Sequence, residues 1–217
     1  MKQDETTDLI KLYVTEKQNV MQNFPIGPIT QAVELVWNAY LNGGTIYACG
    51  NGGNASYVGN LVCDLSMHPF VSDDKSKAMP HNVKRLRTTD LTATTTNLTG
   101  ILNDLGPDKI FSQQLINDGI KKYDVLFGFT GSGNSPNILE AFNIAKEYGA
   151  KTIAITRGTG GKIKDISSLC IIIPGTSTFP GQIASNDNNF HYEDSLSIIT
   201  HMITGIMRKR VTELYDQ

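Results

Sequence analysis

Residues 45–65, TIYACGNGGNASYVGNLVCDL, decide how this chain folds. A short apolar run leads into a turn of glycine and asparagine, and apolar residues at helical spacing follow. A strand that passes through a glycine turn into a helix is the opening unit of an α/β fold. Because the first N–H groups of a helix are unpaired and carry partial positive charge, this turn is a candidate site for an anion such as a phosphate.

Three later segments repeat the strand pattern: residues 124–129 (DVLFGF), 151–156 (KTIAIT) and 169–174 (LCIIIP). Between the first two we predict a helix over residues 136–148, ended by Gly149. This alternation predicts an α/β three-layer sandwich with a central, mostly parallel sheet of the doubly wound, flavodoxin-like type.

Two helical patterns, residues 4–23 and 29–42, precede the first strand and so cannot belong to a parallel sheet. We therefore divide a single domain, residues 1–217, into an N-terminal helical pair (1–43) for oligomerisation and an α/β core (44–217). A last amphipathic helix is predicted over about residues 190–209. Its apolar face and those of the helical pair exceed what a small sheet can cover, which favours a homotetramer with helix-bundle interfaces.

The middle of the chain is less regular. Residues 67–87 are polar and without a clear period, which is typical of a loop or a short insertion. Residues 90–104 are rich in threonine and suit either a strand or the start of a helix. A further helix is predicted over residues 109–120.

Composition excludes several classes of function. The chain is 40% hydrophobic and 18% charged, with a formal charge of -2, so it has no basic footprint for nucleic acid. No apolar run approaches the length of a membrane span, and the acidic N-terminus does not resemble a signal peptide, so we expect a cytoplasmic protein. Cys49, Cys63 and Cys170 form no CxxC pair and are predicted to be buried free thiols.

Three glycine-rich segments follow predicted strands. Residues 50–55 (the GNGGNA turn) fit G-x-G-x-x-A, which is a weak signal alone, and residues 130–135 (the TGSGNS loop) interleave hydroxyls with glycines. Two such segments after strands of one sheet favour a phosphate-type ligand at the carboxyl ends of those strands. Residues 158–163 (the GTGGKI loop) are not a phosphate-binding P-loop, because Ile163 follows the lysine where Ser or Thr is required.

The GNGGNA turn, NLTGILNDLG (residues 97–106), the TGSGNS loop and a terminal helix with a histidine resemble the SIS (sugar isomerase) domain family. Within that family, nearly the whole chain is most similar to the phosphoheptose isomerases, which convert sedoheptulose 7-phosphate to glycero-manno-heptose 7-phosphate for surface-polysaccharide synthesis. The resemblance implies a phosphorylated sugar substrate. The implied substrate contacts are Asn51, Gly52, Gly53, Asn103, Asp104, Thr130, Gly131, Ser132, Ser135 and Glu193. The position of Gly131 usually carries a second hydroxyl in the family.

The resemblance also implies the chemistry. Aldose–ketose interconversion needs a base at carbon and an acid at oxygen, and these roles fall on Asp64 and His201. The family's zinc-site positions correspond to Asn60, Asp64, Glu193 and His201. Asn60 replaces a histidine, and an amide is a poorer zinc ligand than imidazole, so Asp64, Glu193 and His201 remain as implied ligands of Zn²⁺ or another divalent metal.

Helix geometry limits that metal site. Glu193 and His201 are eight residues apart, about 12 Å along a straight helix. Both reach one point only if the helix starts after Glu193 or if they serve sites through different subunits. The other histidines, His68, His81 and His191, carry no signal above that of surface residues, although His191 is close to Glu193 in sequence.

Two other classes of function stay open at this stage. A non-catalytic SIS protein, which binds a phosphosugar or acts like the DnaA-binding initiation factor, is favoured by Asn60 and disfavoured by Asp64, Glu193 and His201. An oxidoreductase that binds a nucleotide cofactor at the GNGGNA turn would leave the TGSGNS loop without a role. We therefore expect no nucleotide cofactor.

Overall fold

The computed structural model describes residues 3–72, 76–79, 82–182 and 187–215. Within these residues, five strands form one sheet in which every neighbouring pair is parallel. The spatial order is β2-β1-β3-β4-β5, which is the order of the flavodoxin-like folds and confirms the predicted class. The strands are β1 (Thr45–Gly50), β2 (Arg87–Asp90), β3 (Val125–Phe129), β4 (Lys151–Arg157) and β5 (Leu169–Ile173).

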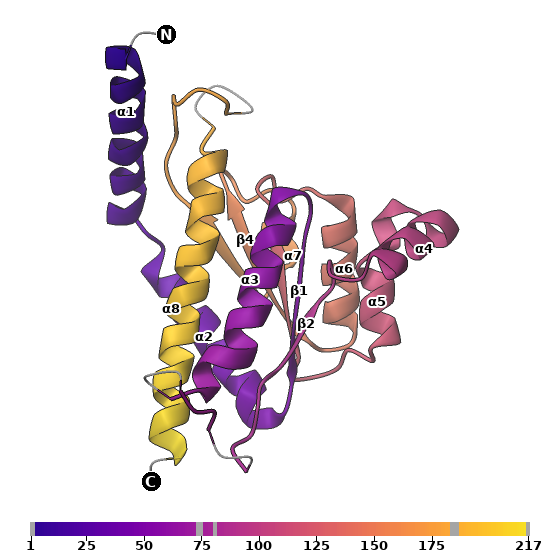
Figure 1. The fold of residues 1–217 in the computed structure, drawn as a ribbon. Coiled ribbons are helices and arrows are strands. Elements are labelled where there is room, and N and C mark those ends of the chain that lie inside the picture. The colour runs from indigo at the N-terminus through magenta and orange to yellow at the C-terminus, as the bar shows by residue number, and fades with distance from the viewer. Residues whose placement is uncertain (1–2, 73–75, 80–81, 183–186, 216–217) are drawn as a thin grey trace.

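Helices cover both faces of the sheet (Figure 1). Successive side chains of a strand point to opposite faces of the sheet, and each face has its own apolar core. In β3, Val125 and Phe127 belong to one apolar cluster and Leu126 belongs to the other. The first cluster packs under α2 (Ile26–Asn42), α3 (Gly53–Met67) and α8 (Asn189–Tyr215). The second packs under α5 (Ser112–Asn117), α6 (Pro136–Glu147) and α7 (Ile163–Ile166). Two buried faces explain why the strands read as continuous apolar runs.

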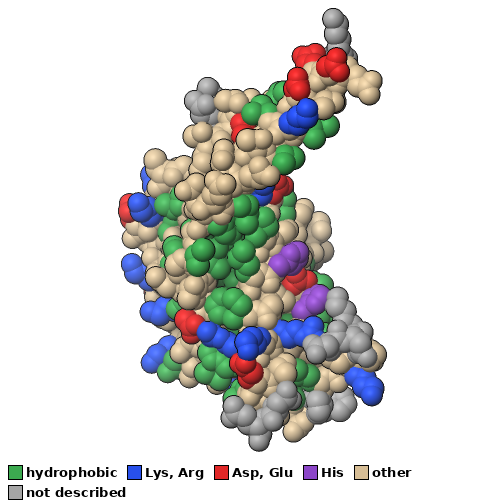
Figure 2. Space-filling model, turned by 90° about the vertical axis from the view of Figure 1, so that its left-hand side faces the viewer, with side chains coloured by type: hydrophobic (Ala, Val, Ile, Leu, Met, Phe, Trp, Pro, Cys, Tyr) green, Lys and Arg blue, Asp and Glu red, His purple; other side chains and the backbone are tan. Residues whose placement is uncertain are grey.

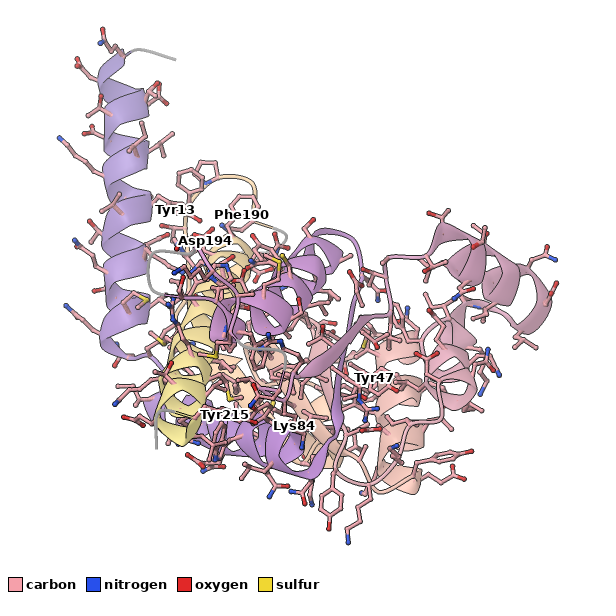
Figure 3. The ribbon with its side chains drawn as sticks, turned by 60° about the horizontal axis from the view of Figure 1, so that its bottom comes forward. Tyr13, Tyr47, Lys84, Phe190, Asp194 and Tyr215 are labelled. Atoms are coloured by element: carbon pink, nitrogen blue, oxygen red, sulfur yellow. The ribbon has the colours of Figure 1, made fainter. Side chains whose placement is uncertain are left out.

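Helix α1 (Gln3–Gln22) extends from the body as an arm (Figure 1). Polar contacts join it to α8: the Tyr13 hydroxyl donates to Asp194 Oδ2 at 2.6 Å, and Lys17 Nζ donates to Ser195 Oγ at 2.9 Å. Figure 3 shows Tyr13 reaching from α1 toward Asp194, beside Phe190. Burial and the Asp194 carboxylate raise the pKa of Tyr13, so this phenol keeps its proton to a higher pH than an exposed tyrosine does.

The arm leaves apolar side chains uncovered. Ile10 and Val14 are exposed, and Val14 and Met21 line a hollow on α1 together with Lys17. Apolar side chains also gather on the body below the arm (Figure 2). Exposed apolar surfaces occur at protein–protein contacts, at membrane contacts and in ligand-binding grooves.

The middle of the chain differs from the sequence prediction. Residues 67–87 were predicted as a loop or insertion, but they contain the short 3₁₀-helix η1 (His68–Phe70) and lead into β2. Residues 90–104 are neither purely strand nor purely helix, because β2 ends at Asp90 and α4 (Thr95–Leu105) follows. The sequence of β2, RTTD, is polar and therefore does not show the apolar pattern of a strand. A polar strand is possible here because β2 is an edge strand, which pairs on one side only and is partly exposed.

Helix lengths and the burial of two cysteines, Cys63 and the partly buried Cys170, also differ. The helix predicted over residues 109–120 divides into η2 (Pro107–Lys109) and α5, and α8 continues to Tyr215 rather than ending near residue 209. Cys49 is buried, and burial raises the pKa of its thiol. Cys63 is exposed, so the prediction of a buried thiol is wrong there, because α3 turns this position away from the sheet. No helix in the described part of the chain is long and apolar enough to cross a membrane.

Candidate active site

The GNGGNA turn connects β1 to α3 at the carboxyl edge of the sheet. Gly52 has φ +57°, a conformation that glycine adopts without strain. Asn51 and Asn137 exchange two side-chain hydrogen bonds, of 2.9 and 2.8 Å, which tie the turn to the first residues of α6. The turn therefore lies beside the helix that begins after the TGSGNS loop.

The TGSGNS loop leaves β3, the neighbour of β1, at the same edge. Thr130 Oγ1 and Ser135 Oγ are 3.3 Å apart, and Ser132 Oγ accepts the backbone N–H of Asn134 at 3.2 Å. Pro136 occupies the first turn of α6, where its missing N–H costs no hydrogen bond. Hydroxyls and the start of a twelve-residue helix are thus gathered at the point where the strand order reverses.

Asp64 and His201 meet on one side of the molecule, where α3 packs against α8. The Asp64 side chain is only 12% exposed, and its Oδ2 lies 3.5 Å from His201 Nε2. Asn60 Nδ2 donates to the same oxygen at 3.2 Å. Ser197, one turn before His201, donates to Asn60 Oδ1 at 3.4 Å. Residues four apart on α8 therefore face residues four apart on α3: Ser197 faces Asn60, and His201 faces Asp64.

Sequence reasoning missed His68. Its Nε2 lies 3.5 Å from Asp64 Oδ1, so the carboxylate has an imidazole at each oxygen. His68 is four residues after Asp64, and this i, i+4 spacing was the available signal. A hollow of about 260 Å³ opens here, lined by Asp64, His68, His201, Thr204, Gly205 and Arg208. Histidine side chains are visible on this surface beside an acidic group (Figure 2).

Other predicted site residues lie elsewhere. Asn103 and Asp104 are on α4, which lies at the opposite end of the molecule from α8 (Figure 1). The Asn103 side chain donates a hydrogen bond to Asp104 Oδ1 at 2.8 Å. His191 is not a surface residue: it is fully buried, with Nε2 3.0 Å from Glu16 Oε2. Burial alone would raise the pKa of Glu16, but hydrogen bonds donated to it, including that of Ser177, lower it. His81 falls outside the described residues.

The structure also decides where Glu193 lies. Helix α8 begins at Asn189, so the helix does not start after Glu193, and one chain does not bring Glu193 and His201 to one point. The Glu193 carboxylate instead accepts from Asn189 Nδ2 at 3.1 Å and lies against Gly53. Burial, together with the negative charge of Glu193, raises the pKa of Tyr57 and of Tyr192.

The implied metal site was tested against these positions. In the part of the chain that the structure describes, no three or more His, Cys, Asp or Glu side chains are grouped so as to hold a metal ion. Asn60 faces Asp64 through its amide nitrogen, which donates and cannot coordinate. The described residues of one chain thus do not assemble the implied donor set.

The sequence of the chain is similar to that of known proteins. The SIS domain family model matches residues 80–157. The phosphoheptose isomerase of Helicobacter pylori (strain Shi470) is 35% identical over 147 residues, which are 68% of this chain and 71% of that protein. The one from Rhodospirillum rubrum is 36% identical over 150 residues, 69% of this chain and 74% of that protein. The chain belongs to the phosphoheptose isomerase family.

Solved phosphoheptose isomerases share the fold. The structure from Neisseria gonorrhoeae has a TM-score of 0.75 at 26% identity and covers 95% of this chain and 98% of that one. The structure from Francisella tularensis has a TM-score of 0.77 at 23% identity and covers 96% and 100%. The shared fold therefore includes most of the N-terminal helical pair.

Proposed function

We propose that this protein is an aldose–ketose isomerase that interconverts sedoheptulose 7-phosphate and D-glycero-D-manno-heptose 7-phosphate. The membership of the phosphoheptose isomerase family supports the reaction class. The observation that carries the proposal is the contact between Asp64 and His201, 3.5 Å apart on a hollow large enough for the reacting end of a sugar. The proposal includes a cytoplasmic location and a role in surface-polysaccharide heptose synthesis.

The proton transfers follow from these two groups. The Asp64 carboxylate takes the proton from the carbon beside the carbonyl and returns it to the neighbouring carbon. His201 gives a proton to the carbonyl oxygen, so that the enediol formed between the two steps carries no full charge, and it takes a proton back from the neighbouring hydroxyl as that oxygen becomes the new carbonyl. Asn60 holds one carboxylate oxygen through its amide, which orients Asp64 while the other oxygen faces His68.

The phosphate of the substrate binds at the TGSGNS loop in this proposal. Thr130, Ser132 and Ser135 offer hydroxyl donors beside the start of α6. A phosphate at the start of a helix is stabilised by the helix dipole as well as by hydrogen bonds. Gly52 and Gly53 border this position from the GNGGNA turn.

The two halves of the site lie apart in one chain. Asp64 is eleven residues beyond Gly53, about 16 Å along α3. Because Asp64 and His201 face outward and the arm leaves an apolar surface uncovered, we propose that a second copy supplies one half of each site, in a homotetramer. Asn103 and Asp104 are remote from Asp64 of the same chain. In the proposed tetramer they contact a substrate that is bound at Asp64 of a neighbouring subunit.

Complementation between two inactive variants tests the shared site. Asp64→Asn and the double variant Ser132→Ala/Ser135→Ala are each expected to be inactive alone. When the two variants are co-expressed in equal amounts, random assembly leaves both halves intact in about one quarter of the sites. The activity per site expected of the mixture is therefore about one quarter of the wild-type activity. Native mass spectrometry checks that hybrid tetramers form. Hybrids without activity would show that each site is built within one subunit.

Turnover is tested directly with purified protein. Sedoheptulose 7-phosphate is added, and the aldose product is followed by NMR with and without a chelator. We expect product formation, and sensitivity to the chelator would show that a metal takes part. A protein that binds the ketose phosphate without converting it would contradict the isomerase and would support the non-catalytic SIS alternative.

A further inference from the structure

Arg157, the last residue of β4, lies against the TGSGNS loop. Its backbone N–H donates to the Gly131 carbonyl at 3.2 Å. If Gly131 carried a Cβ, that atom would lie 3.0 Å from Arg157 Nε and 3.2 Å from Asn189 Oδ1. The guanidinium therefore fills the space that a side chain at position 131 would occupy.

Two side chains at the start of α8 hold the guanidinium. Its Nε donates to Asn189 Oδ1 at 3.2 Å, and Nη1 forms an ion pair with Asp187. The side chains are 18% exposed for Arg157 and 5% for Asp187, so solvent screens this pair weakly. Asn189 in turn donates to Glu193, which borders Gly53. One row of polar contacts thus joins the TGSGNS loop to the GNGGNA turn.

An arginine in this position suits a phosphate. A guanidinium has five N–H donors, and the described residues engage those on Nε and Nη1, which leaves donors for an incoming anion. Charge-assisted hydrogen bonds from arginine to phosphate oxygens are about twice as strong as neutral ones. The hydroxyls of Thr130, Ser132 and Ser135 provide only neutral donors.

We infer that Arg157 binds the substrate phosphate. Its guanidinium lies in the space that a side chain at position 131 would occupy, and from there it reaches the phosphate. Asn189 holds the guanidinium in place, and Asp187 competes with the phosphate for its charge. The inference rests on the proposed function for the identity of the substrate, but the anion contact itself does not depend on turnover.

Replacing the guanidinium at position 157, with loss of its charge (Gln) or with the charge kept (Lys), gives the first test. Arg157→Gln and Arg157→Lys are expected to raise KM for sedoheptulose 7-phosphate about tenfold or more, with kcat changed much less. Stabilisation of the fold by inorganic phosphate, measured as a thermal shift, is expected to disappear. Lys162→Gln removes a positive charge from the neighbouring GTGGKI loop and serves as the matched control, with KM and thermal shift unchanged. An unchanged KM in Arg157→Gln overturns the inference.

A purely structural ion pair is distinguished by Asp187→Asn. If Arg157 binds phosphate, removing its competing carboxylate tightens phosphate binding measured by calorimetry, even if the fold loses stability. If the pair only holds α8 in place, this variant weakens phosphate binding or leaves it unchanged, and the inference fails.

Position 131 gives the reciprocal test. Gly131→Ser adds a hydroxyl but displaces the guanidinium, so phosphate binding is expected to weaken. Gly131→Ser/Arg157→Ala removes the overlap and should bind phosphate more tightly than Arg157→Ala alone. Undiminished binding in Gly131→Ser overturns the inference. If wild-type protein binds phosphate through Arg157 yet converts no ketose phosphate, the proposed function fails while this inference stands.

Discussion

Replacing Asp64 by asparagine lowers kcat for sedoheptulose 7-phosphate by about 10²–10⁴-fold, the usual contribution of a positioned general base. Asparagine keeps the size of the side chain, so the hollow between α3 and α8 keeps its shape, but the amide cannot take a proton from carbon. Because the phosphate contacts lie elsewhere, KM changes much less than kcat. NMR of the aldose product at saturating ketose measures the effect.

Glu213→Gln is the matched control for this prediction. It makes the same carboxylate-to-amide change on α8, at an exposed residue paired with Lys209. We expect wild-type kcat from this variant, and unchanged thermal unfolding from both variants. Full activity in Asp64→Asn would show that Asp64 is not the base and that another group must take the proton.

Replacing Gly133 by alanine destabilises the protein by about 4 kcal/mol, because two separate costs combine. Gly133 has φ +66°, which a Cβ disfavours, and the added atom would overlap the carbonyl oxygen of Gly160. At this size of protein the loss corresponds to a Tm lower by about 10 °C. Thermal unfolding measures it, and calorimetry is expected to show that phosphate binding is lost as the TGSGNS loop shifts.

Gly158→Ala separates the two costs. Gly158 has a similar φ of +61°, but a Cβ there would meet no atom within 4 Å. Only the backbone strain applies, about 1–2 kcal/mol. Equal losses of Tm in Gly133→Ala and Gly158→Ala would mean that the contact between the loops contributes nothing to stability.

The glycines of the GTGGKI loop show where sequence reasoning stopped. The motif could be excluded as a P-loop from Ile163, but its glycines then had no assigned role. In the structure, Gly160 and Gly161 allow this loop to pack backbone to backbone against Ser132 and Gly133. The two loops are far apart in sequence, and only the neighbouring positions of β3 and β4 in the sheet bring them together.

The histidines make the same point for the site. The resemblance to the isomerases selected His201, and the structure places it beside Asp64. His68 was dismissed as a surface residue and yet contacts the other oxygen of the same carboxylate. His191 was also expected at the surface, but the arm helix α1 buries it. How α1 packs depends on contacts with α8, which no local pattern encodes.

The sequence by itself determined the fold class of this protein, although not the edge strand β2. The strand runs, the helical periods and the glycine segments are local patterns, and they were sufficient for a parallel doubly wound sheet with two loops at its carboxyl edge. Only the tertiary structure decided which side chains meet: Asp64 between two imidazoles, Glu193 against Gly53, and Arg157 in the space beside Gly131. These contacts join segments distant in the chain, and the direction of each side chain follows from how helices and loops pack, which spacing along one element does not contain.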